Sequence, residues 1–198
     1  HTMGALRKYL MAILSDYDAW LRVGDNVRSL WRRRVIRHSY FWVPKGELAL
    51  SDEIGDYIQQ KARSLSAFRE PFVGFYPKEG KNARGFADLV VHAQDPKGKR
   101  SPAEVIIEVK GNWNREVRTN LKTQLVKHYL KVRPHSGGIF LCGCYNLPRE
   151  KTVSKYRTSV EARASLKEQK EKLANKVQRR IDVSAIDCSI RGVKTEKI

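Results

Sequence analysis

The stretch that decides the fold of this chain is Val105-Ile106-Ile107-Glu108-Val109-Lys110-Gly111. An apolar, β-branched run of this length that stops at a glycine is typical of a buried strand. Because the side chains of a strand alternate between its two faces, Glu108 and Lys110 project to the same side. A carboxylate and an ammonium group at such positions are costly unless they pair or hold a metal ion. We therefore predict a buried strand with a charged site at its end.

A second apolar run, residues 86–92, predicts another strand, with Asp88 in the middle of Ala-Asp-Leu-Val-Val. The carboxylate of Asp88 needs a partner for the same reason as that of Glu108. The sequence thus favours a site in which Asp88 joins Glu108 and Lys110. The alternative interpretation is a structural Glu-Lys pair on a sheet edge, with Asp88 as a turn or cap residue.

These residues resemble the motif of the PD-(D/E)xK nuclease superfamily, in the branch of RecB-like and Mrr-like enzymes with a restriction-endonuclease fold. The resemblance covers about residues 51–145 and depends on the order helix, strand, Asp strand, E-x-K strand, helix with glutamine, strand. It implies an α/β fold with a mixed central β-sheet flanked by helices, built on an αβββαβ core. It also implies that Asp88 and Glu108 bind a divalent cation and that Lys110 is the catalytic lysine. Ala87 stands where the superfamily usually has proline.

The expected cofactor is Mg²⁺, with Mn²⁺ able to substitute. Mg²⁺ prefers hard oxygen ligands and keeps several waters, so one or two carboxylates and a substrate phosphate suffice. The backbone carbonyl of Val109 points toward the same corner and is a further candidate ligand. A lysine beside the reacting water can stabilise charge that develops in the transition state.

Two helices are expected to add side chains to this site. After the E-x-K strand, apolar residues at helical spacing predict a helix with Gln124 on its flank. The resemblance implies that Gln124 lines the catalytic cleft; RecB-like members often have a tyrosine four residues later, whereas Tyr129 here is five residues later. A first helix is predicted from Ser51, and the resemblance implies an acidic residue there, for which Glu53 is preferred over Asp56. Boundary or dipole-complementing surface roles are the alternatives for Gln124 and Glu53.

Residues 1–3 resemble an expression-tag remnant, and residues 4–45 are expected to form an N-terminal basic helical extension before a nuclease-like domain at 46–198. The extension is predicted to contain helices at 5–22 and 26–38. Arg32, Arg33 and Arg34 in the second helix suit contact with a phosphate backbone. The alternative is that these arginines are simply solvated while Trp31 packs inward.

Two further residues are candidates for nucleic-acid contact. Arg84, in a turn before the Asp strand, is placed to reach a phosphate, although a turn arginine without a function is equally compatible with the sequence. Trp113 lies just beyond the E-x-K strand. Towards the C-terminus, a charged helix over residues 160–181 is expected to precede a strand at 183–190 that returns to the sheet edge.

Composition limits the class of partner. The chain has 198 residues, a formal net charge of +18 and a pI near 10.0, so polyanions are the expected partners. No apolar run is long enough to span a membrane. Three cysteines argue against a disulfide framework and for a reducing compartment, the cytoplasm.

The predicted function is Mg²⁺-dependent hydrolysis of phosphodiester bonds in DNA. The expected context is the nuclease domain of a larger bacterial defence or repair protein, whose other domains would supply target recognition. A homodimer would be needed for concerted double-strand cleavage by single-site subunits. The alternative from another class is a catalytically silent nucleic-acid-binding module of the same fold. A polybasic membrane-surface protein ranks last, because no amphipathic helix with bulky apolar anchors is evident.

Overall fold

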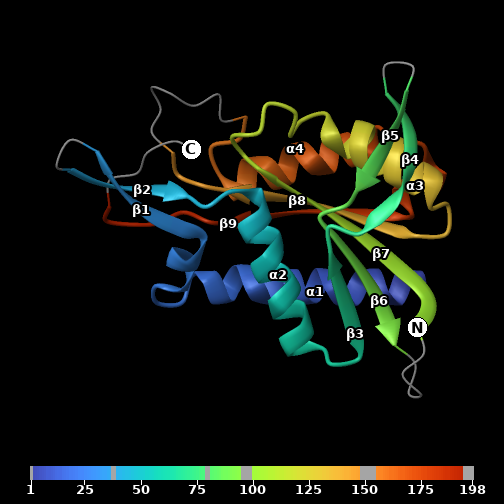
Figure 1. Cartoon of the computed structure of the whole chain (residues 1–198), viewed down its shortest axis with the longest axis horizontal. Helices are drawn as coiled ribbons and strands as arrows, with labels where there is room; N and C mark the ends of the chain where they lie inside the picture. Colours follow the sequence, from blue (N-terminus) through green and yellow to red (C-terminus); the bar gives the residue numbers. More distant parts are fainter. Residues whose placement is uncertain (1, 37–38, 79–80, 95–99, 148–154, 194–198) are drawn as a thin grey trace.

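Five strands form one mixed sheet at the centre of the molecule, in the order β3 (Leu65–Arg69), β6 (Leu89–Gln94), β7 (Arg100–Gly111), β8 (Gly137–Cys144) and β9 (Ile181–Asp187) (Figure 1). The computed structural model describes residues 2–36, 39–78, 81–94, 100–147 and 155–193. The pairs β3–β6 and β6–β7 are antiparallel, whereas the pairs β7–β8 and β8–β9 are parallel. The predicted mixed sheet is therefore confirmed, while its assignment to the restriction-endonuclease-like core stays a prediction.

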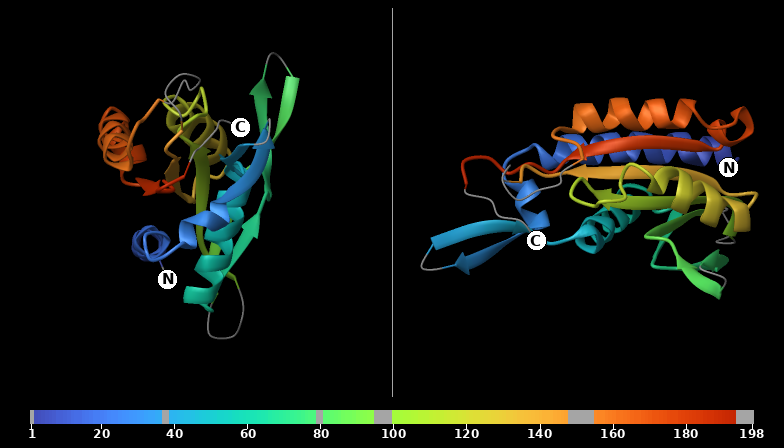
Figure 2. Two further views of the ribbon diagram at one scale, coloured as in Figure 1. Left: turned by 90° about the vertical axis from the view of Figure 1, so that its left-hand side faces the viewer. Right: turned by 90° about the horizontal axis from the view of Figure 1, so that it is seen from above.

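Helices cover both faces of this sheet (Figure 2). On one face lie α1 (Met3–Leu21) and α2 (Glu47–Lys61); on the other lie the π-helix η2 (Leu121–Tyr129), the short α3 (Leu130–Val132) and α4 (Ser159–Glu171). Two hydrophobic clusters result, one between each pair of layers. Strand β7 is buried from both sides, which explains its continuous apolar sequence.

The alternation along β7 assigns each side chain to a face. Val105, Ile107 and Val109 belong to the cluster under α1 and α2, whereas Ile106 belongs to the cluster under η2 and α4. Glu108 and Lys110 share the face of Ile106, as the period of two requires. The charged site therefore lies on the η2 side of the sheet, at the end of β7.

The N-terminal region is only partly the helical extension that we predicted. Helix α1 is present, and its buried Leu6, Leu10 and Leu14 belong to the cluster on the central sheet, so it contributes to the main core. The predicted helix over 26–38 is wrong. A 3₁₀ helix, η1 (Asn26–Leu30), is followed by β1 (Trp31–Ile36), which pairs antiparallel with β2 (Ser39–Pro44). Aromatic and β-branched residues in both segments favour strand pairing, and the pairing of these adjacent segments outweighs helix propensity.

A second hairpin, β4 (Phe72–Lys78) and β5 (Lys81–Phe86), is inserted between β3 and β6. Because β6 begins only at Leu89, the predicted strand over 86–92 starts too early, and Asp88 lies in the bend before β6 rather than inside a strand. Apart from this insertion, the elements follow the order expected from the sequence: α2, β3, β6, β7, η2 and β8.

The C-terminal part partly matches its prediction. Helix α4 ends at Glu171, earlier than expected, and the short α5 (Asn175–Gln178) follows. Strand β9 lies at the sheet edge as predicted. The three cysteines are buried free thiols. No helix in the described part of the chain combines the length and apolar character needed to cross a membrane.

Candidate active site

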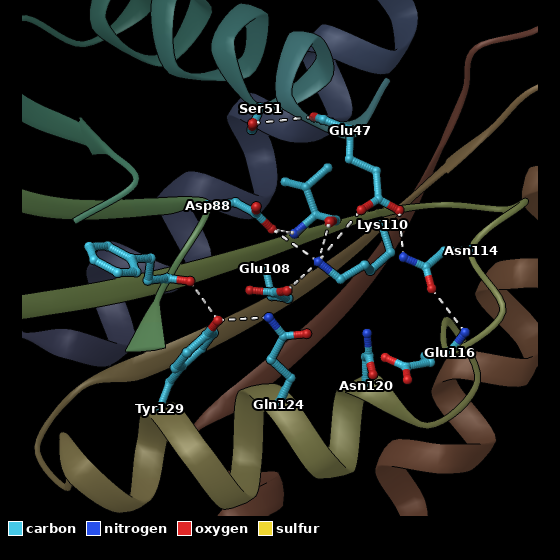
Figure 3. A network of polar contacts seen from close by, with 12 residues as sticks. Glu47, Ser51, Asp88, Glu108, Lys110, Asn114, Glu116, Asn120, Gln124 and Tyr129 are labelled. Carbon is cyan, nitrogen blue, oxygen red and sulfur yellow. Dashed lines mark hydrogen bonds and ion pairs between the residues drawn. The ribbon is translucent and has the colours of Figure 1, made fainter. Parts of the chain in front are cut away.

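Three carboxylates surround the ammonium group of Lys110 at the end of β7 (Figure 3). The Lys110 Nζ lies 2.5 Å from Glu108 Oε1, 3.6 Å from Asp88 Oδ2 and 3.7 Å from Glu47 Oε2. Lys110 also donates a hydrogen bond of 3.1 Å to the carbonyl of Val109. The structure thus brings together Asp88, Glu108 and Lys110 as the sequence predicted.

Local backbone geometry explains the position of Asp88. The last backbone pair of the β6–β7 ladder is Leu89 with Ile107, so Asp88 stands beside the next residues of β7. Its Oδ2 accepts a hydrogen bond of 2.7 Å from the Val109 N–H, which lies beyond the last pair of this ladder. Asp88 therefore terminates the ladder with its side chain and turns a carboxylate toward Lys110.

Glu47, the first residue of α2, joins Asp88, Glu108 and Lys110 and completes a charged cluster. The sequence prediction missed Glu47. Its Oε1 accepts hydrogen bonds from the Gly111 N–H at 2.8 Å and from Asn114 Nδ2 at 2.9 Å. The preceding Gly46 has φ of 114°, a conformation that favours glycine and directs the chain from β2 into α2. The available signal was Gly46-Glu47, a helix start with an acid in the first turn, four residues before the predicted start at Ser51.

Glu53, the predicted acidic residue of the first helix, is not part of the cluster. Its carboxylate accepts hydrogen bonds from the hydroxyls of Tyr17 at 3.2 Å and Ser29 at 2.7 Å. Six residues separate Glu53 from Glu47, about one and two-thirds helical turns, so the two carboxylates leave α2 in different directions. The placement of the acidic residue is corrected to Glu47.

The electrostatics of the cluster follow from burial and an excess of negative charge. Glu108 has no exposed surface; this desolvation, with the charge of nearby Asp88, raises the pKa of Glu108 to about 8 despite the opposing effect of Lys110. Burial alone would lower the pKa of Lys110, but the three carboxylates outweigh it and raise that pKa above its ordinary value. One ammonium group among three carboxylates leaves the site short of positive charge.

The oxygen atoms of this site fit a hard divalent cation. Neither Glu108 oxygen has a hydrogen-bond partner of acceptable geometry, although Oε1 lies close to the Lys110 ammonium group. Asp88 and the Val109 carbonyl face the same corner through their contacts with Lys110. Within the described ranges no three His, Cys or carboxylate side chains form a ready-made metal cage. Mg²⁺ often takes only one or two carboxylates besides water and phosphate, so these residues suit it.

Gln124 approaches the site from the opposite helix. Figure 3 shows its side chain pointing from η2 toward Glu108. Gln124 Nε2 donates a hydrogen bond of 2.7 Å to the Tyr129 hydroxyl, which in turn donates to the Phe86 carbonyl at 2.6 Å. In a π-helix, residues i and i+5 stand on one face, so the π geometry of η2 places Tyr129 beside Gln124 despite the extra residue. This bonded pair links η2 to the end of β5, two residues before Asp88.

The other predicted contact residues have different surroundings. Arg32, Arg33 and Arg34 are exposed on β1. Trp113 is partly buried and packs edge-on against Tyr145, with ring centroids 4.7 Å apart. A Cβ atom at Gly111 would meet the Trp113 ring at 2.5 Å, so this aromatic layer requires glycine at the end of β7. The backbone of Arg84 belongs to β5, but its side chain is outside the described residues.

Comparisons with known proteins gave no match to this chain among protein-family models, curated proteins or solved structures.

Glu47 is expected to matter for activity where Glu53 does not. Glu47→Gln removes the negative charge that lies beside the Lys110 ammonium group and weakens the link between α2 and the end of β7. A supporting contact of this kind costs about 10- to 100-fold in activity when lost. The matched variant Glu53→Gln, in the same helix, should retain near-parental activity when both variants are compared in a plasmid-nicking assay. Equal activity of Glu47→Gln and Glu53→Gln would contradict this assignment.

Without metal, the protein should become less stable as the pH rises from about 5 to 8. Glu108 keeps its proton in the folded state up to about pH 8, whereas the unfolded chain releases it near the ordinary carboxyl pKa. The folded state therefore binds more protons than the unfolded chain in this interval, and the free energy of unfolding falls as the pH rises through it. Glu108→Gln should remove this dependence and be the more stable protein at pH 8, by on the order of a few kcal/mol. Urea unfolding of both proteins in EDTA at pH 5, 6.5 and 8 measures this difference. The same change of unfolding free energy with pH in the parent and in Glu108→Gln would contradict the prediction.

Proposed function

We propose that this protein is a divalent-metal-dependent nuclease that hydrolyses phosphodiester bonds of DNA. The observation that carries the proposal is the convergence of Glu47, Asp88 and Glu108 on the buried Lys110, with the Glu108 oxygens lacking hydrogen bonds. A buried cluster with excess negative charge is costly in a chain of ordinary design. A bound cation would compensate this excess charge.

Each residue then has a chemical role. Glu108, Asp88 and the Val109 carbonyl would hold Mg²⁺, which supplies positive charge that polarises the phosphodiester. Lys110 donates hydrogen bonds toward the reacting phosphate and stabilises the negative charge that develops there. Glu47 holds the Lys110 side chain and the Gly111 backbone in place. Gln124, fixed by Tyr129, supplies an amide on the η2 side of the site.

The substrate is proposed to be DNA. The net charge of +18 supports a polyanionic substrate but does not distinguish DNA from RNA. The preference for DNA depends on the resemblance of Asp88, Glu108 and Lys110 to the PD-(D/E)xK motif. On the same basis, we propose that the chain acts in bacterial defence or repair together with further domains that recognise the target.

A second candidate function is a catalytically silent nucleic-acid-binding module. The observation that favours it is the position of Lys110, whose ammonium group already compensates part of the carboxylate charge without any metal. In this reading the cluster would be a buried ion-pair network that holds α2, β6 and β7 together.

A cleavage assay separates the two functions. The parent protein and Lys110→Ala would be incubated with supercoiled plasmid, linear duplex and single-stranded DNA, in Mg²⁺, Mn²⁺ or EDTA. The nuclease predicts cutting that requires metal and is lost in the variant. Tight DNA binding with no cutting in any metal would favour the silent module.

A further inference from the structure

The β1–β2 hairpin projects from the body of the molecule as an arm that does not pack on either face of the central sheet (Figures 1 and 2). Arg32, Arg33, Arg34 and Tyr40 are exposed on it. Its strands are in register from Trp31 opposite Pro44 to Ile36 opposite Ser39. Because side chains alternate along each strand, Arg33 shares one face of the hairpin with the aromatic residues Tyr40 and Trp42. Arg32 and Arg34 lie on the opposite face.

The charge of this arm is of one sign. Between Asp25 and Glu47 the sequence has no acidic residue; its basic residues are Arg28, Arg32, Arg33, Arg34, Arg37 and Lys45. Among the described residues, none of the three consecutive β1 arginines forms an ion pair. The Arg33 guanidinium lies over the Tyr40 ring, 3.9 Å from its centroid, and the Arg28 guanidinium lies 5.6 Å from the Trp42 centroid. Stacking of this kind orients a guanidinium while leaving its N–H edge available to an anion.

The root of the arm is fixed to the core. Trp31 is buried, its Nε1 donates a 2.9 Å hydrogen bond to the Cys188 carbonyl, and its ring packs against Tyr145 with centroids 5.3 Å apart. The Lys45 N–H donates to the Leu30 carbonyl at 2.9 Å and closes the base of the hairpin. A ligand that binds a pre-organised arm pays less for ordering it.

The same root adjoins the catalytic cluster. Strand β2 ends at Pro44, three residues before Glu47. Tyr145, which packs against Trp31, also packs against Trp113, and the Trp113 ring covers Gly111 at the end of β7. A duplex held by the arm would therefore be anchored next to the elements that carry Glu47 and Lys110.

We propose that the β1–β2 hairpin is a DNA-binding arm whose Arg32, Arg33 and Arg34 contact backbone phosphates of a duplex beside the scissile bond. A two-stranded ribbon fits the major groove of B-DNA, whereas the major groove of A-form RNA is too deep and narrow to be read this way. That the bound duplex is also the substrate rests on the proposed function, but binding by the arm is testable without cleavage.

The test is the affinity of the triple variant Arg32→Ala/Arg33→Ala/Arg34→Ala for a duplex of about 30 base pairs, in EDTA and over a range of salt concentrations. Each lost phosphate contact reduces the log–log salt slope by about 0.9, so the slope should fall by about 2 to 3. At 0.1 M salt the affinity should drop on the order of 100-fold. The matched control is Lys167→Ala/Lys176→Ala/Arg179→Ala, which removes the same charge from exposed positions. These residues lie in α4, in α5 and directly after α5, away from the β1–β2 hairpin.

The outcomes separate the arm from the nuclease. Equal losses in the two triple variants would overturn the arm, because general charge would then explain binding. Unchanged affinity of the β1 variant would also overturn it, even if the parent protein cleaves DNA. A selective loss in the β1 variant would support the arm, even if the parent protein cleaves no DNA and the proposed nuclease fails.

Discussion

Replacing Glu108 by glutamine, or Asp88 by asparagine, is expected to lower metal-dependent DNA cleavage at least about 1000-fold. Either amide keeps the size of the side chain but removes an anionic oxygen ligand. Glu108 lies wholly in the interior, so no water molecule can take the place of the lost anionic oxygen. Duplex binding in EDTA below pH 8 should be unchanged in Glu108→Gln, because without metal Glu108 keeps its proton there. It should be unchanged or tighter in Asp88→Asn, because a negative charge that repels phosphate is removed. Plasmid nicking and fluorescence anisotropy on the same preparations would measure both quantities.

The chain offers a control on the same strand. Glu104 shares the β7 face of Glu108, about 13 Å earlier along the strand, and pairs with Arg133 at 3.2 Å. Glu104→Gln should therefore cut DNA within a few-fold of the parent. If Glu108→Gln and Asp88→Asn cleave as fast as Glu104→Gln, this is not the active site.

The parts of the site that the sequence predicted are those set by local periodicity. The alternation in residues 105–110 placed Glu108 and Lys110 on one face of a buried strand, and the structure has them there. Asp88 lies at the same corner although β6 begins only at Leu89, the residue after it. The antiparallel β6–β7 pairing fixes the position of Asp88 relative to Val109. Short-range patterns were therefore sufficient for Glu108 and Lys110, whereas the position of Asp88 depends on strand pairing.

The errors came from features that hydrophobic periodicity does not show. Residues 26–38 have enough apolar spacing for a helix, yet residues 31–36 pair with 39–44. The acidic residue of α2 was misplaced because the helix begins at Glu47, where Gly46 reverses the chain after β2. The π geometry of η2, which brings Tyr129 to Gln124, has no signature in hydrophobic periodicity.

Removing the ammonium group of Lys110 is expected to have the largest effect on stability. In Lys110→Ala, three carboxylates remain around a buried space with no counter-charge. Loss of one partner from a buried ion-pair network typically costs about 3–5 kcal/mol. We expect a loss of this size at pH 8 in EDTA, and a smaller one near pH 5, because Glu108 then carries a proton and needs no counter-charge. Thermal unfolding at the two pH values would measure it, with exposed Lys172→Ala, which breaks only a surface pair with Glu168, as the control.

Divalent metal should reverse much of this loss. If the carboxylates form a cation site, Mg²⁺ or Mn²⁺ replaces the positive charge that Lys110 supplied, and ligand binding to the folded state raises its stability. The melting temperature of Lys110→Ala should then rise more on addition of metal than that of the parent, in which the ammonium group competes for the same oxygens. A variant destabilised in EDTA but insensitive to metal would identify the cluster as a structural ion-pair network. Because this readout requires no cleavage, it tests the cation site separately from the chemistry proposed for it.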